Sequence, residues 1–150
     1  QNIQYEKRIH HTDIFSTILG AANIAPPEDI KIDGVNLIPY LTNEIIGEPH
    51  ETLYWKNATY QAIIHKDWKL MRSKYPEERE YLYNLKVDPY ETNNLAMTEI
   101  AMKSLLHEKL NTHINSLPEP SWPQSVFMPV VIDKPQTEYE EGDELVFWPN

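Results

Sequence analysis

The stretch that decides the fold is residues 51–73, which read ETLYWKNATYQAIIHKDWKLMRS. It holds three short runs rich in Thr, Tyr, Ile and Trp, which are Glu51–Lys56, Thr59–His65 and Trp68–Ser73. Turn-like pairs, Asn57-Ala58 and Lys66-Asp67, separate the runs and leave no room for a crossover helix. With Glu80–Leu85 as a fourth candidate strand, the sequence predicts a small antiparallel meander.

A long helix is predicted downstream, between Met97 and Leu117. Its apolar residues form an amphipathic stripe of Ile100, Leu105, Leu106, Leu110 and Ile114. A sheet of this size is not stable with both faces in water, so we expect this helix to cover one of them. The predicted fold class is therefore α+β.

A second amphipathic helix is predicted upstream, from Thr12 to Ala22, with Thr12 or Asp13 as its N-cap. A short helical stretch around Leu37, Ile38 and Leu41 follows the turn pair Asp33-Gly34. The first helix has no neighbour in sequence against which to bury Ile14, Phe15, Ile18 and Leu19. We therefore expect a larger body to precede Gln1.

Three segments follow from these patterns. Residues 1–48 are expected to end a large domain and connect it onward, and residues 49–117 to form the sheet and its helix. Residues 118–150 form a Pro-rich and acidic tail, in which Val126–Ile132 and Leu145–Trp148 are candidate edge strands.

Composition excludes several classes of function. The formal net charge of −10 argues against a nucleic-acid binder, because such proteins concentrate Lys and Arg. No run reaches the roughly 20 apolar residues of a membrane-spanning helix. The absence of cysteine rules out disulfides, thiolate zinc sites and a cysteine nucleophile within this sequence.

The residues alone do not describe a complete active site. There is no GxSxG elbow, no HExxH motif and no Gly-rich phosphate loop. The most suggestive cluster is aromatic with lysines: Tyr54, Trp55, Lys56, Tyr60, Trp68 and Lys69. Aromatic faces with Lys donors suit sugar rings that carry anionic groups, although aromatic residues are also common in half-buried strands. Trp55 and Lys56 are the predicted substrate contacts, and His65, at a strand end, can face a ligand or support its turn.

Four ordered motifs resemble the C-terminal region of formylglycine-dependent sulfatases of the alkaline phosphatase superfamily. They are HTDIFSTIL at 11–19, IDGVNLIPYL at 32–41, YWK at 54–56 followed by AIIHKDWKL at 62–70, and YLYNLKVDPYETNNLA at 81–96. Each motif is weak alone, but the ordered set is specific. Ser16 stands where the family usually has proline.

The resemblance implies an α/β core upstream of this chain, followed by a small antiparallel sheet with a C-terminal helix. It implies a formylglycine nucleophile made within a C/S-x-P-x-R motif, and a calcium ion, both outside this chain. The expected partners are that N-terminal domain and a sulfated carbohydrate substrate. In such enzymes the turn after the first strand lies nearest the pocket, which adds Asn57 to the predicted substrate-binding residues.

Two other interpretations stay open at this point. One is a related phosphodiesterase or phosphonate hydrolase of the same superfamily. The other is a stand-alone carbohydrate-binding or interaction module. The sulfatase interpretation predicts an exposed or partner-covered apolar stripe at Ile14, Ile18 and Leu19, and the module does not.

Overall fold

The computed structural model describes residues 4–57, 60–74 and 78–119. The backbone divides into two compact units, Gln1–Leu53 and Tyr54–Asn150, and each is described by itself. The candidate edge strands at 126–132 and 145–148, and the tail beyond residue 119, lie outside the described residues.

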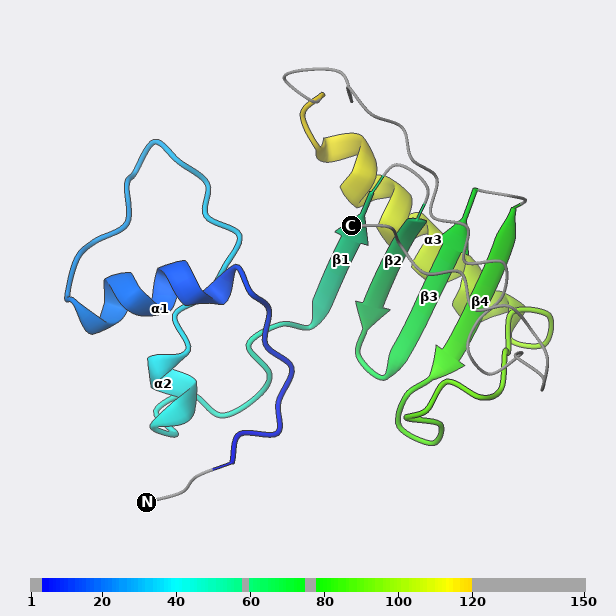
Figure 1. The fold of residues 1–150 in the computed structure, drawn as a ribbon, viewed down its shortest axis with the longest axis horizontal. Coiled ribbons are helices and arrows are strands. Elements are labelled where there is room, and N and C mark those ends of the chain that lie inside the picture. The colour runs from blue at the N-terminus through cyan, green and yellow to red at the C-terminus, as the bar shows by residue number, and fades with distance from the viewer. Residues whose placement is uncertain (1–3, 58–59, 75–77, 120–150) are drawn as a thin grey trace, which may run out of the picture. The chain divides into compact units, whose positions relative to one another are not determined.

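The later part of the chain forms a four-stranded sheet in the order β1-β2-β3-β4 (Figure 1). Its strands are β1 (Thr52–Lys56), β2 (Tyr60–His65), β3 (Trp68–Ser73) and β4 (Arg79–Asn84). Strands β2 and β3 pair antiparallel from Tyr60↔Ser73 to His65↔Trp68, and β3 and β4 from Trp68↔Asn84 to Ser73↔Arg79. The predicted meander and the α+β class are confirmed.

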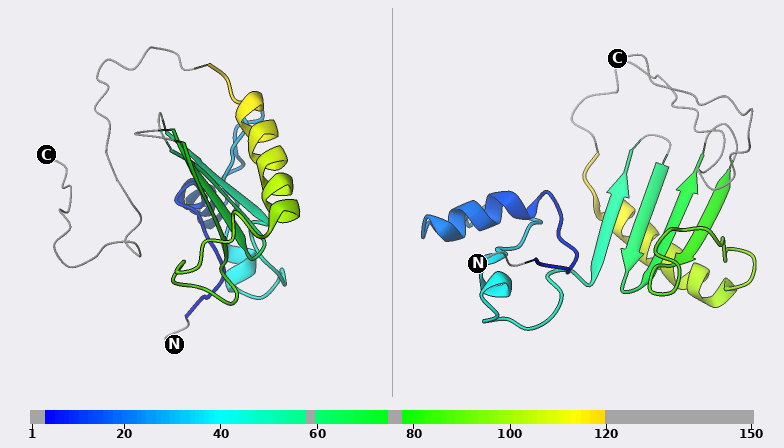
Figure 2. Two further views of the ribbon diagram at one scale, coloured as in Figure 1. Left: turned by 90° about the vertical axis from the view of Figure 1, so that its right-hand side faces the viewer. Right: turned by 60° about the horizontal axis from the view of Figure 1, so that its bottom comes forward.

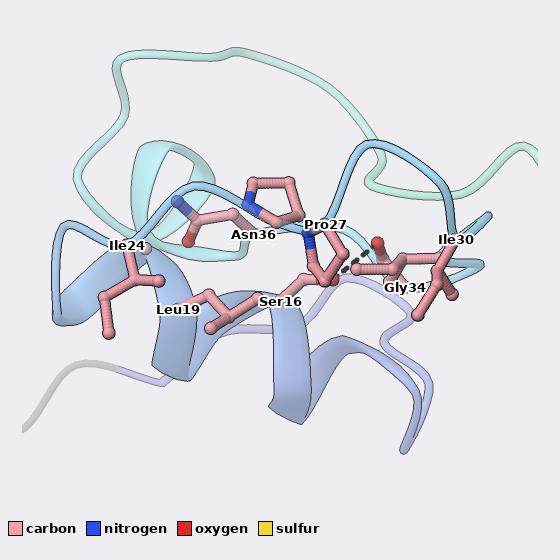
Figure 3. Close-up of a pocket in the computed structure, with 10 residues that line it drawn as sticks. Ser16, Leu19, Ile24, Pro27, Ile30, Gly34 and Asn36 are labelled. Carbon is pink, nitrogen blue, oxygen red and sulfur yellow. Dashed lines mark hydrogen bonds between the residues drawn. The ribbon is translucent and has the colours of Figure 1, made fainter.

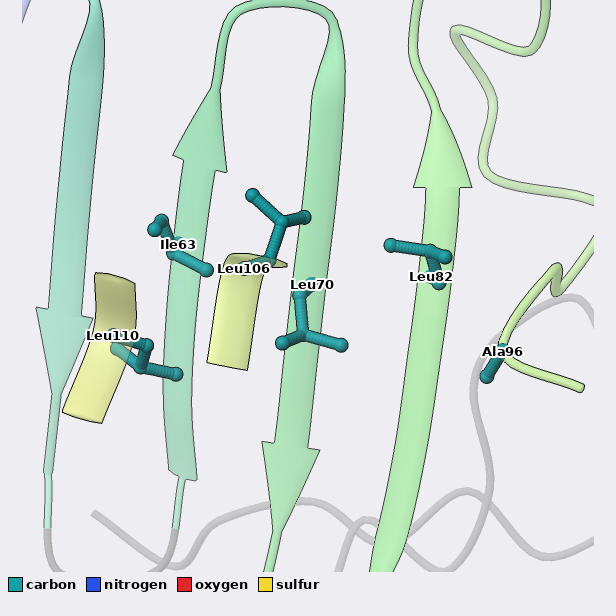
Figure 4. Close-up of a cluster of buried hydrophobic side chains, with 6 residues drawn as sticks. All are labelled: Ile63, Leu70, Leu82, Ala96, Leu106 and Leu110. Atoms are coloured by element: carbon teal, nitrogen blue, oxygen red, sulfur yellow. The ribbon is translucent and has the colours of Figure 1, made fainter. Parts of the chain in front are cut away.

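Helix α3 (Ile100–Ser116) covers one face of this sheet, as the edge-on view in Figure 2 shows. The core between them consists of Ile63, Leu70, Leu82, Ala96, Leu106 and Leu110 (Figure 4). Trp68 packs against this cluster, as do Met102 and Ile114. The helix therefore contacts the sheet through positions 102, 106, 110 and 114, which recur every four residues.

The predicted stripe on this helix is wrong at two positions. Ile100 is 52% exposed and Leu105 is 40% exposed. Leu105 lies one residue, or about 100° of rotation, away from buried Leu106, so it points off the sheet. Ile100 is the first helical residue, ahead of the positions that contact the core.

A polar network joins α3 to the sheet beside this core. Arg72 on β3 donates to Gln61 and to Asn111, and its Nη1 lies 3.4 Å from Nδ1 of His107. Glu80 on β4 accepts from Nε2 of His107 at 2.6 Å. The helix is thus held by hydrogen bonds as well as by apolar contact.

The first unit contains α1 (Asp13–Ala21) and the short α2 (Ile38–Leu41). Ser16 donates to the carbonyl of Gly34 at 2.8 Å, and Thr17 accepts from the N–H of Leu37 at 3.0 Å. A Cβ on Gly34 would come within 2.0 Å of the Thr12 carbonyl oxygen, so this close approach requires glycine.

The predicted N-cap of α1 forms no side-chain cap bond. Thr12 occupies the cap position, but its hydroxyl instead meets the Nδ1 of His10 at 3.0 Å. Asp13 is turned toward residues outside the helix. Within the described ranges, no helix has the length and apolar character needed to cross a membrane.

Candidate functional site

The candidate site is a shallow cavity of about 230 Å³ where β1 ends and β2 begins. Trp55, Lys56 and Asn57 line it, so the structure brings three of the four predicted substrate-binding residues together. Tyr60, Gln61, Ala62 and Met71 complete the lining. The cavity is smaller than the usual drug-sized pocket, and its size fits one small ring.

Strand pleating explains why Trp55 faces this cavity. Successive side chains on a strand point to opposite faces. Tyr54 points toward α3, where its ring stacks on His113 with centroids 3.9 Å apart and planes 8° apart. Trp55 therefore lies on the face that α3 leaves uncovered, together with Ala62 and its cross-strand partner Met71.

The turn that carries Asn57 is closed by two hydrogen bonds to Tyr60. The Asn57 N–H donates to the Tyr60 carbonyl at 2.9 Å, and the Tyr60 N–H donates to Oδ1 of Asn57 at 2.6 Å. Asn and Asp side chains commonly stabilise turns in this way. The turn holds the ends of both strands in place beside the cavity.

His65 lies elsewhere. It ends β2 opposite Trp68 and is only 8% exposed. Tyr60 begins the same strand, so His65 sits about 17 Å along it from Tyr60 at the ordinary rise per residue, and it does not line the cavity. The structure does not group His65 with the other three residues, and its proposed role stays a prediction.

The cavity offers an aromatic face and a cation. Trp55 is 38% exposed and Lys56 is exposed, and none of the described residues forms an ion pair with Lys56. The other lysine of the aromatic cluster, Lys69, is already bound by Glu91 at 2.6 Å. An aromatic ring beside an available ammonium group can bind an apolar ring face that bears an anion.

No metal site is formed by this part of the protein. Among the described residues, no three His, Asp or Glu side chains gather closely enough to hold a metal ion. The calcium ion implied by the sulfatase resemblance therefore does not fit the described residues.

A second cavity, of about 380 Å³, lies within the first unit. Figure 3 shows Ser16 and Leu19 of α1 and, from the loop that follows, Ile24, Pro27 and Ile30 around it. Its lining is mainly aliphatic, and Ile24 and Ile30 are more than half exposed. It lacks charged groups that would recognise a sulfated ligand.

One polar arrangement was not predicted from the sequence. Asp13 is fully buried and accepts the N–H of His10 at 2.7 Å and the N–H of Val35 at 2.9 Å. Nε2 of His50 lies 2.8 Å from its Oδ1 and 2.9 Å from its Oδ2. Burial by itself raises the pKa of this carboxyl, but the two N–H donors and His50 more than offset burial, so the pKa lies below its ordinary value.

Comparisons with known proteins agree with the motifs. No protein-family model matches the chain. The uncharacterized sulfatase YdeN of Escherichia coli is 47% identical over 51 residues, which are 34% of this chain and 9% of that protein.

Solved structures share the fold. One is BT4656 in complex with its substrate D-glucosamine-2-N,6-O-disulfate, at a TM-score of 0.56 and 23% identity, covering 69% of this chain and 23% of that one. Another is the phosphonate monoester hydrolase of Agrobacterium radiobacter, at a TM-score of 0.56 and 22% identity, covering 75% and 26%. The chain thus spans about a quarter of the length of these structures.

The sequence match and the shared fold confirm the relationship that the four motifs indicated. Over 51 residues the chain is similar in sequence to a sulfatase, and over more than two thirds of its length it shares the fold of solved structures that include BT4656.

Proposed function

We propose that this chain forms one wall of the substrate pocket in an enzyme that hydrolyses sulfate esters of a carbohydrate. The observation that carries the proposal is the meeting of Trp55, Lys56 and Asn57 in one cavity where β1 ends and β2 begins. The sulfatase name of the sequence relative and the sulfated sugar bound by BT4656 support the reaction class and the substrate class.

The two exposed side chains have distinct tasks in this proposal. The indole of Trp55 stacks on the C–H face of a sugar ring, and the ammonium of Lys56 neutralises a sulfate group. Both groups bind and orient the substrate, and neither transfers a proton or attacks the ester. Asn57 holds the turn through its bond to Tyr60.

The bond-breaking chemistry is assigned to sequence outside this chain. A formylglycine nucleophile and a calcium ion would supply it, and the described residues offer neither a candidate nucleophile motif nor a metal site. The proposed partner is therefore an N-terminal sulfatase domain.

The exposed face of α1 supports such a partner. Ile14 is 61% exposed, Phe15 53% and Ile18 61%, while Leu19 is half-buried beside the aliphatic cavity. Apolar patches of this kind mark interaction surfaces in soluble proteins. A stand-alone carbohydrate-binding module does not require this stripe, so the observation favours the larger enzyme.

The phosphonate hydrolase alternative shares the same fold. The likeness to the Agrobacterium radiobacter enzyme is as close in TM-score as that to BT4656. The fold therefore does not separate the two reactions, and a direct assay is needed.

The first experiment is to determine the intact mass and complete coding sequence of the native polypeptide, and to assay it on sulfate esters, phosphonate monoesters and phosphodiesters. We expect a polypeptide several times longer than this chain, with a C/S-x-P-x-R motif upstream and the highest kcat/KM on a sulfated sugar. A preference for phosphonate or phosphodiester would favour the alternative hydrolase. A native polypeptide of this length that binds saccharide without hydrolysis would favour the module.

The same enzyme can be used to test whether Trp55 and Lys56 contact the substrate. Lys56→Gln should raise KM for the sulfated sugar about fivefold, since an exposed charge pair contributes roughly 1 kcal/mol. Trp55→Ala should raise it about tenfold through lost stacking. Lys86→Gln removes another exposed lysine, beyond β4, and should change nothing. Unchanged KM values in both wall variants would remove Trp55 and Lys56 from the pocket.

A further inference from the structure

Tyr60 lies in the wall of the same cavity, beside the three residues singled out from the sequence. Its backbone is held on both sides by Asn57, through the bonds of 2.6 and 2.9 Å. The position of its Cα relative to Trp55 and Lys56 is therefore fixed by the turn. The part of Tyr60 that can rotate when a ligand binds is therefore its side chain.

The hydroxyl of Tyr60 is buried, and no described residue hydrogen-bonds it. A buried tyrosine hydroxyl usually has a partner, because leaving it unsatisfied is unfavourable. Such a group calls for an explanation, and a bound water, ion or ligand is one of them.

We propose that Tyr60 is a further specificity residue of this pocket, whose hydroxyl turns into the cavity and hydrogen-bonds an oxygen of a bound sugar. The inference rests on the proposed function and deepens it. The rotation breaks no hydrogen bond between the hydroxyl and a described residue, because none of these residues bonds it. The two backbone bonds to Asn57 hold Tyr60 in the cavity lining, so its hydroxyl can reach a sugar ring that stacks on Trp55.

The combination defines a ligand class. Trp55 contacts the apolar face of one ring, Lys56 binds an anionic substituent, and Tyr60 both donates and accepts a hydrogen bond. These three groups match a sulfated monosaccharide unit, either a free sugar or one residue of a chain. The aliphatic floor of Ala62 and Met71 offers no polar partner for a larger charged group.

The test compares Tyr60→Phe with Tyr90→Phe in the native polypeptide that contains this chain. Tyr90 is 83% exposed and lies in the loop after β4, so its variant is a matched control for loss of a tyrosine hydroxyl. Thermal unfolding is measured on the free proteins. Affinity is measured by NMR titration with galactose 6-sulfate, and with galactose to report the contribution of the sulfate.

In the free chain, Tyr60→Phe should unfold at or above the wild-type temperature, because it removes an unsatisfied group. Its affinity for galactose 6-sulfate should fall about three- to tenfold, the range of one lost hydrogen bond. Tyr90→Phe should match wild type in both measurements.

Three results would overturn the inference. A lower unfolding temperature for Tyr60→Phe would show that the hydroxyl has a partner within the fold. An unchanged affinity would show that it does not touch the sugar. Absence of any saturable binding by the wild-type native polypeptide would show that the cavity is not a sugar subsite. None of these results decides whether the longer protein is a sulfatase, which the hydrolysis assay tests separately.

Discussion

Replacement of Asp13 by alanine should unfold the first unit while leaving the second intact. Asp13 is completely buried at the start of α1. Its carboxylate joins three parts of the chain that are distant in sequence, through the N–H groups of His10 and Val35 and the ring of His50. Alanine leaves all three donors without an acceptor.

The magnitude follows from these contacts. A hydrogen bond to a charged group contributes about 1.5–3 kcal/mol, so three of them set an upper limit that water entry reduces. Leaving a buried donor without an acceptor costs about 1–3 kcal/mol, and with three donors affected we expect Asp13→Ala to cost about 3–5 kcal/mol. Asp13→Asn keeps one acceptor oxygen but places an NH2 group where an N–H donor now points, so roughly 2–3 kcal/mol is expected.

The control is Ser16→Ala, which removes one neutral hydrogen bond from the same helix to Gly34. It should cost about 1 kcal/mol. Because the chain has two units, a global melting curve does not isolate the effect. Amide hydrogen exchange does: protection at the Leu41 N–H, which bonds to Leu37 at 2.9 Å in the first unit, should be lost in Asp13→Ala, and protection at the Leu95 N–H, which bonds to Leu82 at 2.8 Å, should persist.

The pH dependence has a definite sign. The pKa of Asp13 is held below its ordinary value, so its contribution is present above the unfolded value of about 3.9 and is lost as pH falls through the folded pKa. Asp13→Asn should lack this acid-side loss in Leu41 protection. The reasoning is refuted if Asp13→Ala changes the stability of the first unit by less than Ser16→Ala does.

Three further predictions concern the second unit. Leu106→Ala should lower its unfolding free energy by about 2–5 kcal/mol in urea titrations followed by Trp68 fluorescence, whereas Leu105→Ala, at a 40% exposed site on the same helix, should cost less than about 1 kcal/mol. Arg72→Lys should cost about 1–3 kcal/mol in the same titration, since an ammonium group does not reach Gln61, His107 and Asn111 together. The N–H groups of Thr92 and then Asn93 hold the pKa of Asp88 below its ordinary value, so NMR should show the 88–93 turn opening only as pH falls through that lowered pKa, and Asp88→Asn should abolish the transition.

The sheet was predictable because its signals are local. The Lys66-Asp67 pair makes a tight turn in which Lys66 adopts a φ of 52°, and the strands on either side follow directly. The predicted strand Trp68–Ser73 is the observed β3. In a meander each strand pairs with its neighbour in sequence, so turn positions are enough to set the order.

The burial of His65 also had a signal in the sequence. Gln61, Ile63 and His65 alternate along β2, and all three are buried. A residue two positions after a core isoleucine shares its face of the sheet. The alternation along the strand thus indicates that His65 faces α3. The prediction that it can face a ligand rests instead on its position at the end of the strand.

Long-range polar contacts had no comparable signal. Asp13 and His50 are 37 residues apart, and Arg72 and Asn111 are 39 apart. No periodicity links such pairs, because their meeting depends on how whole elements pack. The sequence likewise gives no sign that the buried hydroxyl of Tyr60 lacks a hydrogen-bond partner among the described residues.

The chain near β1 nevertheless shows how these two kinds of contact act together. Ahead of the strand, His50 is bonded to Asp13, and after it Asn57 is bonded to Tyr60. The end of the strand that carries Trp55 and Lys56 is therefore restrained by the bonds between Asn57 and Tyr60. A binding site works best when rigid elements hold its side chains before the ligand arrives.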